Sequence, residues 1–250
     1  MRAIEILKKD GLGAFFRKAL AYTKLDFLIL PYALIKVKKF KFANLDDLVD
    51  SCLHGIGVLV KPLQIRSEIL ELVSVLDRIK PNVVIEIGTY SDGTLFLLSR
   101  VAAEDATIIS IDFPDVRFGG GYPVWKIPLY KGFRLPKQKL HLLRADSHSK
   151  ETLEKVKNIL GDRKVDFVFI DGDHAYEGVK KDFEMFSPLV KKDGMIAFHD
   201  IVVHPSETGC EVNKFWNEVI KEGKYQSAEI VDDWNQGMGG IGLLFMDFKG

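Results

Sequence analysis

Short apolar runs alternate with amphipathic stretches from about residue 62 onwards. Apolar residues recur every three or four positions over 65–79, which predicts a helix that ends before Pro81. Further helices are expected over 93–103, 149–160, 179–189 and 212–220, and strands over 83–87, 107–111, 139–143, 165–170, 195–198, 227–231 and 241–246. Nearly all-apolar strands between helices are typical of a parallel sheet covered on both faces. We therefore predict an α/β fold with a doubly wound, mostly parallel seven-stranded sheet that closes on an antiparallel pair.

Residues 1–41 differ from the rest of the chain in charge. They hold ten basic and three acidic residues, so they carry +7, and residues 42–250 carry −7 because the whole chain is neutral. An apolar run over 27–35 lies within this segment, and Pro31 is expected to interrupt any helix through it. Such a segment either packs on the main domain or a partner subunit, or contacts an anionic membrane surface. We predict an N-terminal extension, helical in part, over 1–61 and a main domain over 62–250.

Composition narrows the class of protein. The 250 residues are 47% hydrophobic and 28% charged, which is typical of a globular protein. Cys52 and Cys210 are too few for a disulfide framework and indicate a reducing compartment. No apolar run approaches the ~20 residues that span a bilayer. We expect a cytoplasmic protein, in contact with a membrane surface if residues 1–41 reach one. The zero net charge argues against a nucleic-acid partner, and the extension suits a homo-oligomer such as a dimer.

Small and polar residues follow the first predicted strand, in the order Glu86-Ile-Gly88-Thr89-Tyr90-Ser-Asp-Gly93. The two glycines permit a tight turn and a close approach of a ligand to the backbone. Tyr90 stands where a dinucleotide-binding turn has a glycine that makes room for pyrophosphate, which disfavours an NAD-dependent oxidoreductase. Glu86 suits a ligand that carries an ammonium or sulfonium group.

Acidic residues also end the second and third predicted strands. Asp112 can accept hydrogen bonds from both hydroxyls of a ribose, and the alternative is a solvated turn residue before Pro114. Asp146 can accept a hydrogen bond from an adenine amino group, with Ser147 beside it. The alternative for Asp146 is a helix N-cap formed with Ser147 or Ser149.

Acidic residues and histidines are most concentrated after the fourth and fifth predicted strands. Asp171, Asp173 and His174 end the fourth strand, and His199 and Asp200 end the fifth. Asp171, His199 and Asp200 together can hold a divalent cation, and His174 has a side chain suited to a general base near neutral pH. The alternatives are that Asp173 caps the following helix and that His199 is a core histidine bonded to a backbone carbonyl.

Taken together, these motifs resemble class I S-adenosylmethionine (SAM)-dependent methyltransferases, over about residues 63–246. The segment Asp171-Gly-Asp-His-Ala-Tyr-Glu-Gly-Val-x-x-Asp182, with His199-Asp200, is similar to the branch that includes sugar and antibiotic O-methyltransferases and the cephalosporin hydroxylase group. The resemblance implies a Rossmann-like fold and SAM as cofactor. It assigns cofactor contacts to Glu86, Gly88, Thr89, Tyr90, Gly93, Asp112, Asp146, Ser147 and Asp171.

The resemblance also implies roles in catalysis. Asp171 and Asp200 would bind a metal ion, with His199 in the same set, and His174 would act as the base. His199 departs from the family pattern, in which magnesium-dependent relatives commonly carry an acid. Imidazole suits transition metals better than magnesium, so the choice between Mg²⁺ and Mn²⁺ stays open.

The expected reaction is methyl transfer from SAM to a hydroxyl oxygen of a small-molecule or sugar acceptor. The aromatic residues of an insertion over 118–133 are expected to cover that acceptor or to form a subunit interface: Tyr122, Trp125, Tyr130 and Phe133. The loop over 203–209 is a second candidate wall. The alternative function is a non-catalytic nucleotide- or SAM-binding protein that retains the pocket.

Overall fold

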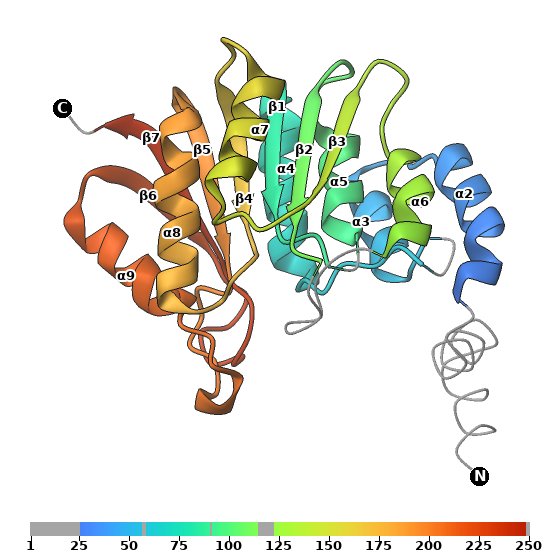
Figure 1. Cartoon of the computed structure of the whole chain (residues 1–250). Helices are drawn as coiled ribbons and strands as arrows, with labels where there is room; N and C mark the ends of the chain where they lie inside the picture. Colours follow the sequence, from blue (N-terminus) through green and yellow to red (C-terminus); the bar gives the residue numbers. More distant parts are fainter. Residues whose placement is uncertain (1–25, 57–58, 91, 115–122, 249–250) are drawn as a thin grey trace.

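The computed structural model describes residues 26–56, 59–90, 92–114 and 123–248. Seven strands form one sheet in the order β3-β2-β1-β4-β5-β7-β6 (Figure 1). The strands are β1 (Val83–Ile87), β2 (Thr107–Asp112), β3 (Lys139–Arg144), β4 (Val165–Ile170), β5 (Val190–His199), β6 (Tyr225–Ile230) and β7 (Ile241–Phe248). The first five pair in parallel, and β7 runs antiparallel to both β5 and β6. The predicted doubly wound, mostly parallel sheet is confirmed.

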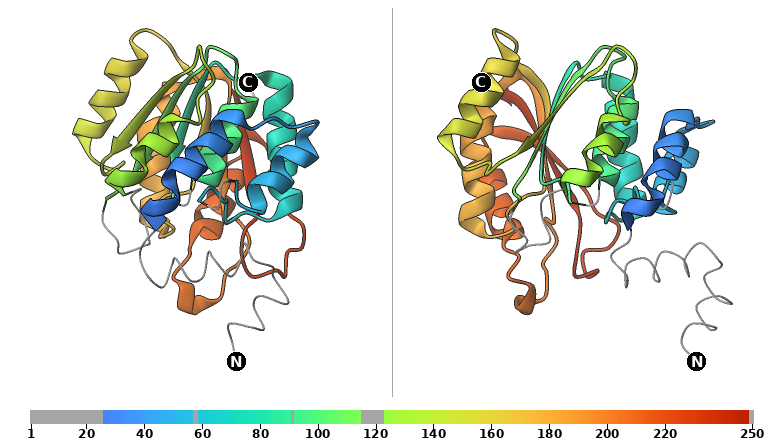
Figure 2. Two further views of the ribbon diagram at one scale, coloured as in Figure 1. Left: turned by 90° about the vertical axis from the view of Figure 1, so that its right-hand side faces the viewer. Right: turned by 45° about the vertical axis from the view of Figure 1, so that its right-hand side comes forward.

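Helices cover both faces of the sheet (Figure 2). One face carries α2 (Leu30–Lys39), α3 (Leu45–Leu53), α4 (Arg66–Ile79), α5 (Gly93–Val101) and α6 (Ile127–Lys131). The other carries α7 (Lys150–Leu160), α8 (Tyr176–Phe186) and α9 (Val212–Glu222). Short 3₁₀ turns complete the described elements: η1 (Asp26–Ile29), η3 (Val124–Lys126), η4 (Ser187–Leu189) and η5 (Ser206–Thr208).

Two hydrophobic cores result, because successive residues of a strand point to opposite faces. In β1, Val84 belongs to the core under α4 and α5, whereas Val83, Ile85 and Ile87 belong to the core under α7 and α8. All five residues of β1 are buried, including Glu86. A buried acid in an otherwise apolar strand is costly unless it has a role.

The strand order reverses between β1 and β4. From β1 the sheet extends to β2 and β3 on one side and to β4 and β5 on the other. In open α/β sheets, ligands bind outside the carboxyl ends of the strands at such a point. The predicted site residues follow the carboxyl ends of β1 to β5, so the fold brings them to one edge of the sheet.

Two expectations about local structure are wrong. Pro31 does not interrupt a helix but lies in the first turn of α2, where its missing N–H leaves no hydrogen bond unmade. Tyr130 and Phe133 do not cover an acceptor. Both are fully buried in the core, where Phe133 packs edge to face on Phe96 with ring centroids 5.3 Å apart. Tyr122, from the same predicted wall, lies outside the described residues.

The described part of the N-terminal region packs on the main core. Ala33 and Val37 of α2, and Leu48, Val49 and Cys52 of α3, are all buried in the core that α4 and α5 share. Among the helices of the described residues, none combines the length and apolarity needed to cross a bilayer.

Candidate active site

A cavity of about 900 Å³ opens beyond the carboxyl ends of the central strands. This volume is typical of small-molecule and cofactor sites. The lining includes all but one of the residues predicted for the cofactor, the base and the metal: Gly88, Thr89, Tyr90, Gly93, Asp112, Asp146, Ser147, Asp171, His174, His199 and Asp200. The exception is Glu86, which is fully buried beneath this surface.

The turn after β1 is held in a conformation that few residues tolerate. Gly88 has φ +85°, and a Cβ at this position would lie 1.9 Å from the carbonyl oxygen of Asp171. A Cβ on Gly93 would lie 1.9 Å from the backbone nitrogen of Pro62. Tyr90 and Asp92 also adopt positive φ, at 38° and 74°. Strained backbone of this kind is concentrated at functional sites.

Glu86 lies in a small buried hydrogen-bond group under the turn. Thr89 Oγ1 donates to Glu86 Oε2 at 2.7 Å and also bonds the Ser110 hydroxyl. Within the described residues, Glu86 Oε1 is buried without a hydrogen-bond partner. Burial raises the pKa of Glu86 well above its ordinary value, against the hydrogen bond from Thr89, and Asp112 and Asp171 raise it further. Without a nearby cation, this carboxyl group therefore favours its neutral form.

Asp112 and Asp146 lie at the rim of the cavity. The Tyr90 amide donates to Asp112 Oδ2 at 3.0 Å, and Asp112 is only 6% exposed. Asp112 is therefore not the solvated turn residue of the alternative. Asp146 Oδ1 accepts from the His148 amide at 2.8 Å. The N-cap of α7 is Ser149, whose side chain accepts from the Glu151 amide, so Asp146 does not itself cap this helix.

Beyond β4 and β5, two carboxylates and three imidazoles form a cluster. His199 Nδ1 lies 3.1 Å from Asp171 Oδ1 and 3.3 Å from Asp200 Oδ1. His174 lies between the same carboxylates, with Nε2 3.5 Å from Asp171 and Nδ1 3.6 Å from Asp200. His204 Nε2 lies 3.2 Å from Asp200 Oδ1. Because His199 Nδ1 faces carboxylates, His199 is not a core histidine bonded to a backbone carbonyl.

Charges in the cluster stabilise one another. Burial opposes the charged form of His199, but Asp171 and Asp200 outweigh it, and the pKa of His199 lies well above its usual value. The hydrogen bond to Asp171 raises the pKa of His174, against burial. Burial would raise the pKa of Asp171, yet His199 and His174 lower it overall. The pKa of Asp200 is lowered, against burial, by His199, His204 and His174. The cluster therefore favours ionised carboxylates beside imidazolium groups.

The predicted metal ligands are close enough to share an ion. One donor atom from each of Asp171, His199 and Asp200 lies within 4.8 Å of the other two. Two carboxylates and one imidazole fit a divalent cation with mixed oxygen and nitrogen preference, such as Mn²⁺, better than Mg²⁺. Asp173 has a different role, because its Oδ1 accepts from the Ala175 amide just before α8. It stabilises the turn but is not the N-cap residue of that helix.

Several residues at the cavity were not singled out from the sequence. Gln64 Nε2 donates to Asp171 Oδ2 at 3.1 Å, from a segment 107 residues away in the chain. His148 lines the cavity and lies 3.3 Å from the buried Asp182. By contrast, His204, Pro205 and Thr208 line the cavity from the loop over 203–209, which the sequence did predict as a second wall. Isolated residues such as Gln64 carry no motif, so only the fold reveals them.

Comparison with known proteins identifies the domain. The model of a protein family described as a methyltransferase domain matches residues 85–201. These residues hold the turn after β1, Asp112, Asp146, Asp171, His174 and the His199-Asp200 pair. This match confirms the prediction of a methyltransferase domain over these residues.

Solved structures share the fold. The O-methyltransferase TomG from Streptomyces achromogenes, involved in tomaymycin synthesis and solved with SAM, is 15% identical, with 85% of this chain and 92% of that chain covered and a TM-score of 0.50. An O-methyltransferase from Bacillus cereus, solved with S-adenosylhomocysteine (SAH), is also 15% identical, with coverage of 83% and 92% and a TM-score of 0.51. Identities this low establish the Rossmann-like fold alone.

One curated relative matches part of the chain. The uncharacterised protein y4gI from Sinorhizobium fredii is 25% identical over 151 residues, which is 56% of this chain. The match spans only 15% of the length of that protein. It therefore concerns one segment of a much longer chain.

Proposed function

We propose that this chain, which carries a methyltransferase domain over residues 85–201, transfers a methyl group from SAM to a hydroxyl oxygen of a small-molecule or sugar acceptor. The proposal rests on one observation: the predicted cofactor residues and the Asp–His cluster line the same cavity. The SAM- and SAH-bound O-methyltransferases of the same fold support both the cofactor and the oxygen acceptor.

The cavity has the chemistry that SAM requires. Asp112 offers a carboxylate at the rim for the ribose hydroxyls, and Asp146 with Ser147 lies further along the same rim for the adenine. The glycine turn after β1 leaves backbone exposed to the methionine half. Glu86 supplies a buried acid beneath that turn, next to the place of a cationic ligand.

His174 is the proposed base. SAM supplies an electrophilic methyl group on a positively charged sulfur. A hydroxyl is a poor nucleophile at neutral pH, so its proton must leave as the oxygen attacks. The His174 side chain is 46% exposed, and it lines the cavity between Asp171 and Asp200. In its neutral form it can accept the hydroxyl proton, and the two carboxylates then stabilise the imidazolium.

Asp171, His199 and Asp200 are the proposed ligands of a divalent cation, Mg²⁺ or Mn²⁺. Such an ion lowers the pKa of a bound hydroxyl. Gln64, bonded to Asp171 Oδ2, fixes the orientation of that carboxylate.

Calorimetry tests the cofactor. We expect SAM and SAH, but not NADH, to bind the chelator-treated protein. Asp112→Ala should weaken SAM binding about 10- to 100-fold, since hydrogen bonds to a charged group contribute ~1.5–3 kcal/mol. The control is Asp105→Ala, which removes an exposed acid outside the cavity lining. If neither SAM nor SAH binds, the proposal fails.

Methyl transfer tests the base. A panel of phenols, catechols and free sugars is incubated with methyl-labelled SAM, and the labelled product is counted. With an accepted substrate, His174→Ala should lower kcat at least about 100-fold while the SAM affinity changes little. His141→Ala, on β3 and outside the cavity lining, is the matched control. An unchanged kcat in His174→Ala would remove His174 from the mechanism.

The location of the protein and its contacts with a membrane or a second copy are a separate proposal. Leu28, Tyr32 and Ile35 are each more than half exposed on η1 and α2, beside Lys36, Lys38 and Lys39. An apolar and basic helix face of this kind suits an anionic membrane surface or a second copy of the chain. We retain peripheral membrane contact, a homo-oligomer and a cytoplasmic location as proposals, together with the division at residue 61.

A further inference from the structure

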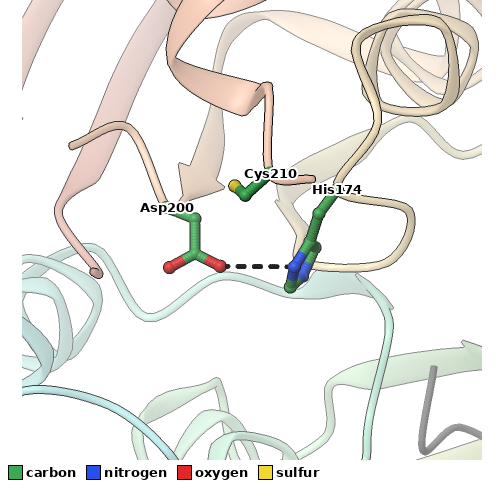
Figure 3. Close-up of side chains that lie close together, drawn as sticks. All are labelled: His174, Asp200 and Cys210. Carbon is green, nitrogen blue, oxygen red and sulfur yellow. Dashed lines mark ion pairs between the residues drawn. The ribbon is translucent and has the colours of Figure 1, made fainter. Parts of the chain in front are cut away.

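Two side chains outside the proposed magnesium or manganese set, His174 and Cys210, meet one member of that set, Asp200. One donor atom from each of His174, Asp200 and Cys210 lies within 4.8 Å of the other two. Figure 3 shows the three side chains converging from different segments, after β4, after β5 and before α9. Together they offer one nitrogen, one oxygen and one sulfur atom.

Asp200 presents one oxygen to this group because its other oxygen is engaged. Asp200 Oδ1 accepts from the Gly239 amide at 2.9 Å and lies near His199 and His204. In the described part of the chain, the contact found for Oδ2 is His174 Nδ1, at 3.6 Å. Asp200 is only 5% exposed and holds the strained φ of +66°, and the hydrogen bond from Gly239 restrains its carboxylate in this direction.

His174 and Cys210 are joined through the backbone. The Glu211 amide donates to the His174 carbonyl at 2.8 Å, which places the residue before it, Cys210, beside the imidazole. The Cys210 amide donates to the Thr208 hydroxyl at 3.2 Å. The hydrogen bond from Glu211 to His174 therefore links the two ligand-bearing loops.

The distances suit a small ion. In tetrahedral zinc sites, bond lengths of ~2.0–2.2 Å place nitrogen and oxygen ligands about 3.4 Å apart. His174 Nδ1 and Asp200 Oδ2 are 3.6 Å apart, which is longer than an ordinary hydrogen bond. Cys210 Sγ lies within 4.8 Å of both atoms, so a shift of at most about 1 Å completes the set.

We propose that His174, Asp200 and Cys210 form a second metal site, selective for zinc-like transition-metal ions, and that its occupation inhibits the enzyme. The thiolate donor of Cys210 selects such ions over Mg²⁺ and Mn²⁺. Burial raises the pKa of Cys210 to about 11, so the thiol holds its proton until a cation binds the sulfur. That proton is then released to solvent.

Inhibition follows from the chemistry of imidazole. A neutral ring has one nitrogen with a free lone pair, and the other carries a proton. A metal ion on Nδ1 of His174 uses that lone pair, so no nitrogen remains to accept a proton from the acceptor hydroxyl. This inhibition rests on the proposed role of His174 as base, whereas metal binding at the site does not.

Cobalt is the probe for binding, because a Co²⁺–thiolate bond gives a charge-transfer band in the near ultraviolet. The chelator-treated protein is titrated with Co²⁺ in excess Mg²⁺. We expect the band in the unmodified protein and in Cys52→Ala, which removes the core cysteine, and its loss in Cys210→Ala. Zn²⁺ should displace the cobalt. No band, or a band that persists in Cys210→Ala, would overturn the site.

Inhibition is measured separately, by methyl transfer with excess Mg²⁺ and rising Zn²⁺. Cys210→Ala should keep its activity and require at least about tenfold more Zn²⁺ for half-inhibition, since losing even an outer-shell partner of a metal costs 10- to 100-fold in affinity. Equal inhibition of both proteins would overturn the inhibitory role. Failure of SAM to bind would contradict the proposed function and leave the cobalt result intact.

Discussion

The cofactor side and the histidine side of the cavity use carboxylates in different ways. On the cofactor side each acid has its own partners: Glu86 bonds Thr89, and Asp112 accepts from the Tyr90 amide. On the histidine side, Asp171 and Asp200 share His174 and His199, and each contact lies between 3.1 and 3.6 Å. A substitution on the first side changes one local contact, whereas one on the second changes the charge state of a coupled group.

This difference separates recognition from chemistry. A fixed ligand such as a nucleoside needs contacts that do not change during turnover. Proton transfer needs a group that can accept a proton, and two flanking carboxylates stabilise the imidazolium that His174 then becomes. Substitutions on the two sides should therefore have separable effects, except where the sides touch.

Gly88→Ala acts where the two sides touch, so it should have the largest effect. The new Cβ would lie 1.9 Å from the carbonyl oxygen of Asp171, at φ +85°. Backbone must move on both sides, and we expect a loss of about 4 kcal/mol or more of unfolding free energy. Urea denaturation of Gly88→Ala and of the unmodified protein measures this loss.

The control for this clash is Gly223→Ala. Gly223, after α9, also has positive φ, at 66°, and is left-handed, but a Cβ there has no atom within 4 Å among the described residues. Only the left-handed conformation is penalised, at about 1–2 kcal/mol. If both variants lose the same stability, the contact between the turn after β1 and Asp171 does not limit the fold.

The sequence predicts the cofactor side better than the histidine side. Strand ends fix where Gly88 and Asp112 lie, because short apolar runs define β1 and β2 within a residue. Cys210 and Gln64 reach the cluster through loops whose paths leave no periodic pattern, and Gln64 is 107 residues from Asp171. Tyr130 and Phe133 were misassigned because aromatic residues in a glycine-rich insertion resemble a binding wall. In the structure both are buried in the core, where Tyr130 packs on Phe133 and Phe133 on Phe96.

Asp92 lies in the turn after β1, and its buried carboxylate affects the stability of the cofactor side. Its fully buried carboxylate accepts from the Tyr130 hydroxyl at 2.9 Å and lies 3.3 Å from Lys126 Nζ. Burial nevertheless raises the pKa of Asp92 to about 6, from 3.8. A raised carboxyl pKa favours folding at low pH, and this contribution is lost as the pH rises through about 6. Two pKa units correspond to about 3 kcal/mol.

Asp92→Asn removes this titration and keeps a residue that tolerates φ +74°. Relative to the unmodified protein, the variant should gain up to about 3 kcal/mol of stability between about pH 4 and pH 7. Urea denaturation of both cofactor-free proteins at several pH values gives the difference in their unfolding free energies. The contributions of the other carboxylates are the same in both proteins and cancel in this difference. A difference that does not vary with pH would show that Asp92 keeps an ordinary pKa and that Lys126 offsets its burial.

Glu86→Gln should have the smallest effect, and it reports what the buried acid recognises. Glu86 does not line the cavity, so it acts through Thr89 and through its charge. Because burial already favours the neutral carboxyl in the empty protein, the amide should change stability by less than about 1 kcal/mol. A cationic ligand favours the ionised form, and losing that attraction should weaken binding about three- to tenfold, or ~0.7–1.4 kcal/mol.

Three ligands identify the cation, measured by calorimetry on both proteins. SAM carries an ammonium and a sulfonium group, SAH only the ammonium, and methylthioadenosine neither. If Glu86 responds to the ammonium, Glu86→Gln weakens SAM and SAH equally and leaves methylthioadenosine unchanged; a loss confined to SAM identifies the sulfonium instead. An equal loss for all three would mean that Glu86 only supports the turn through Thr89, and the contrast between the two sides would then rest on Asp112 alone.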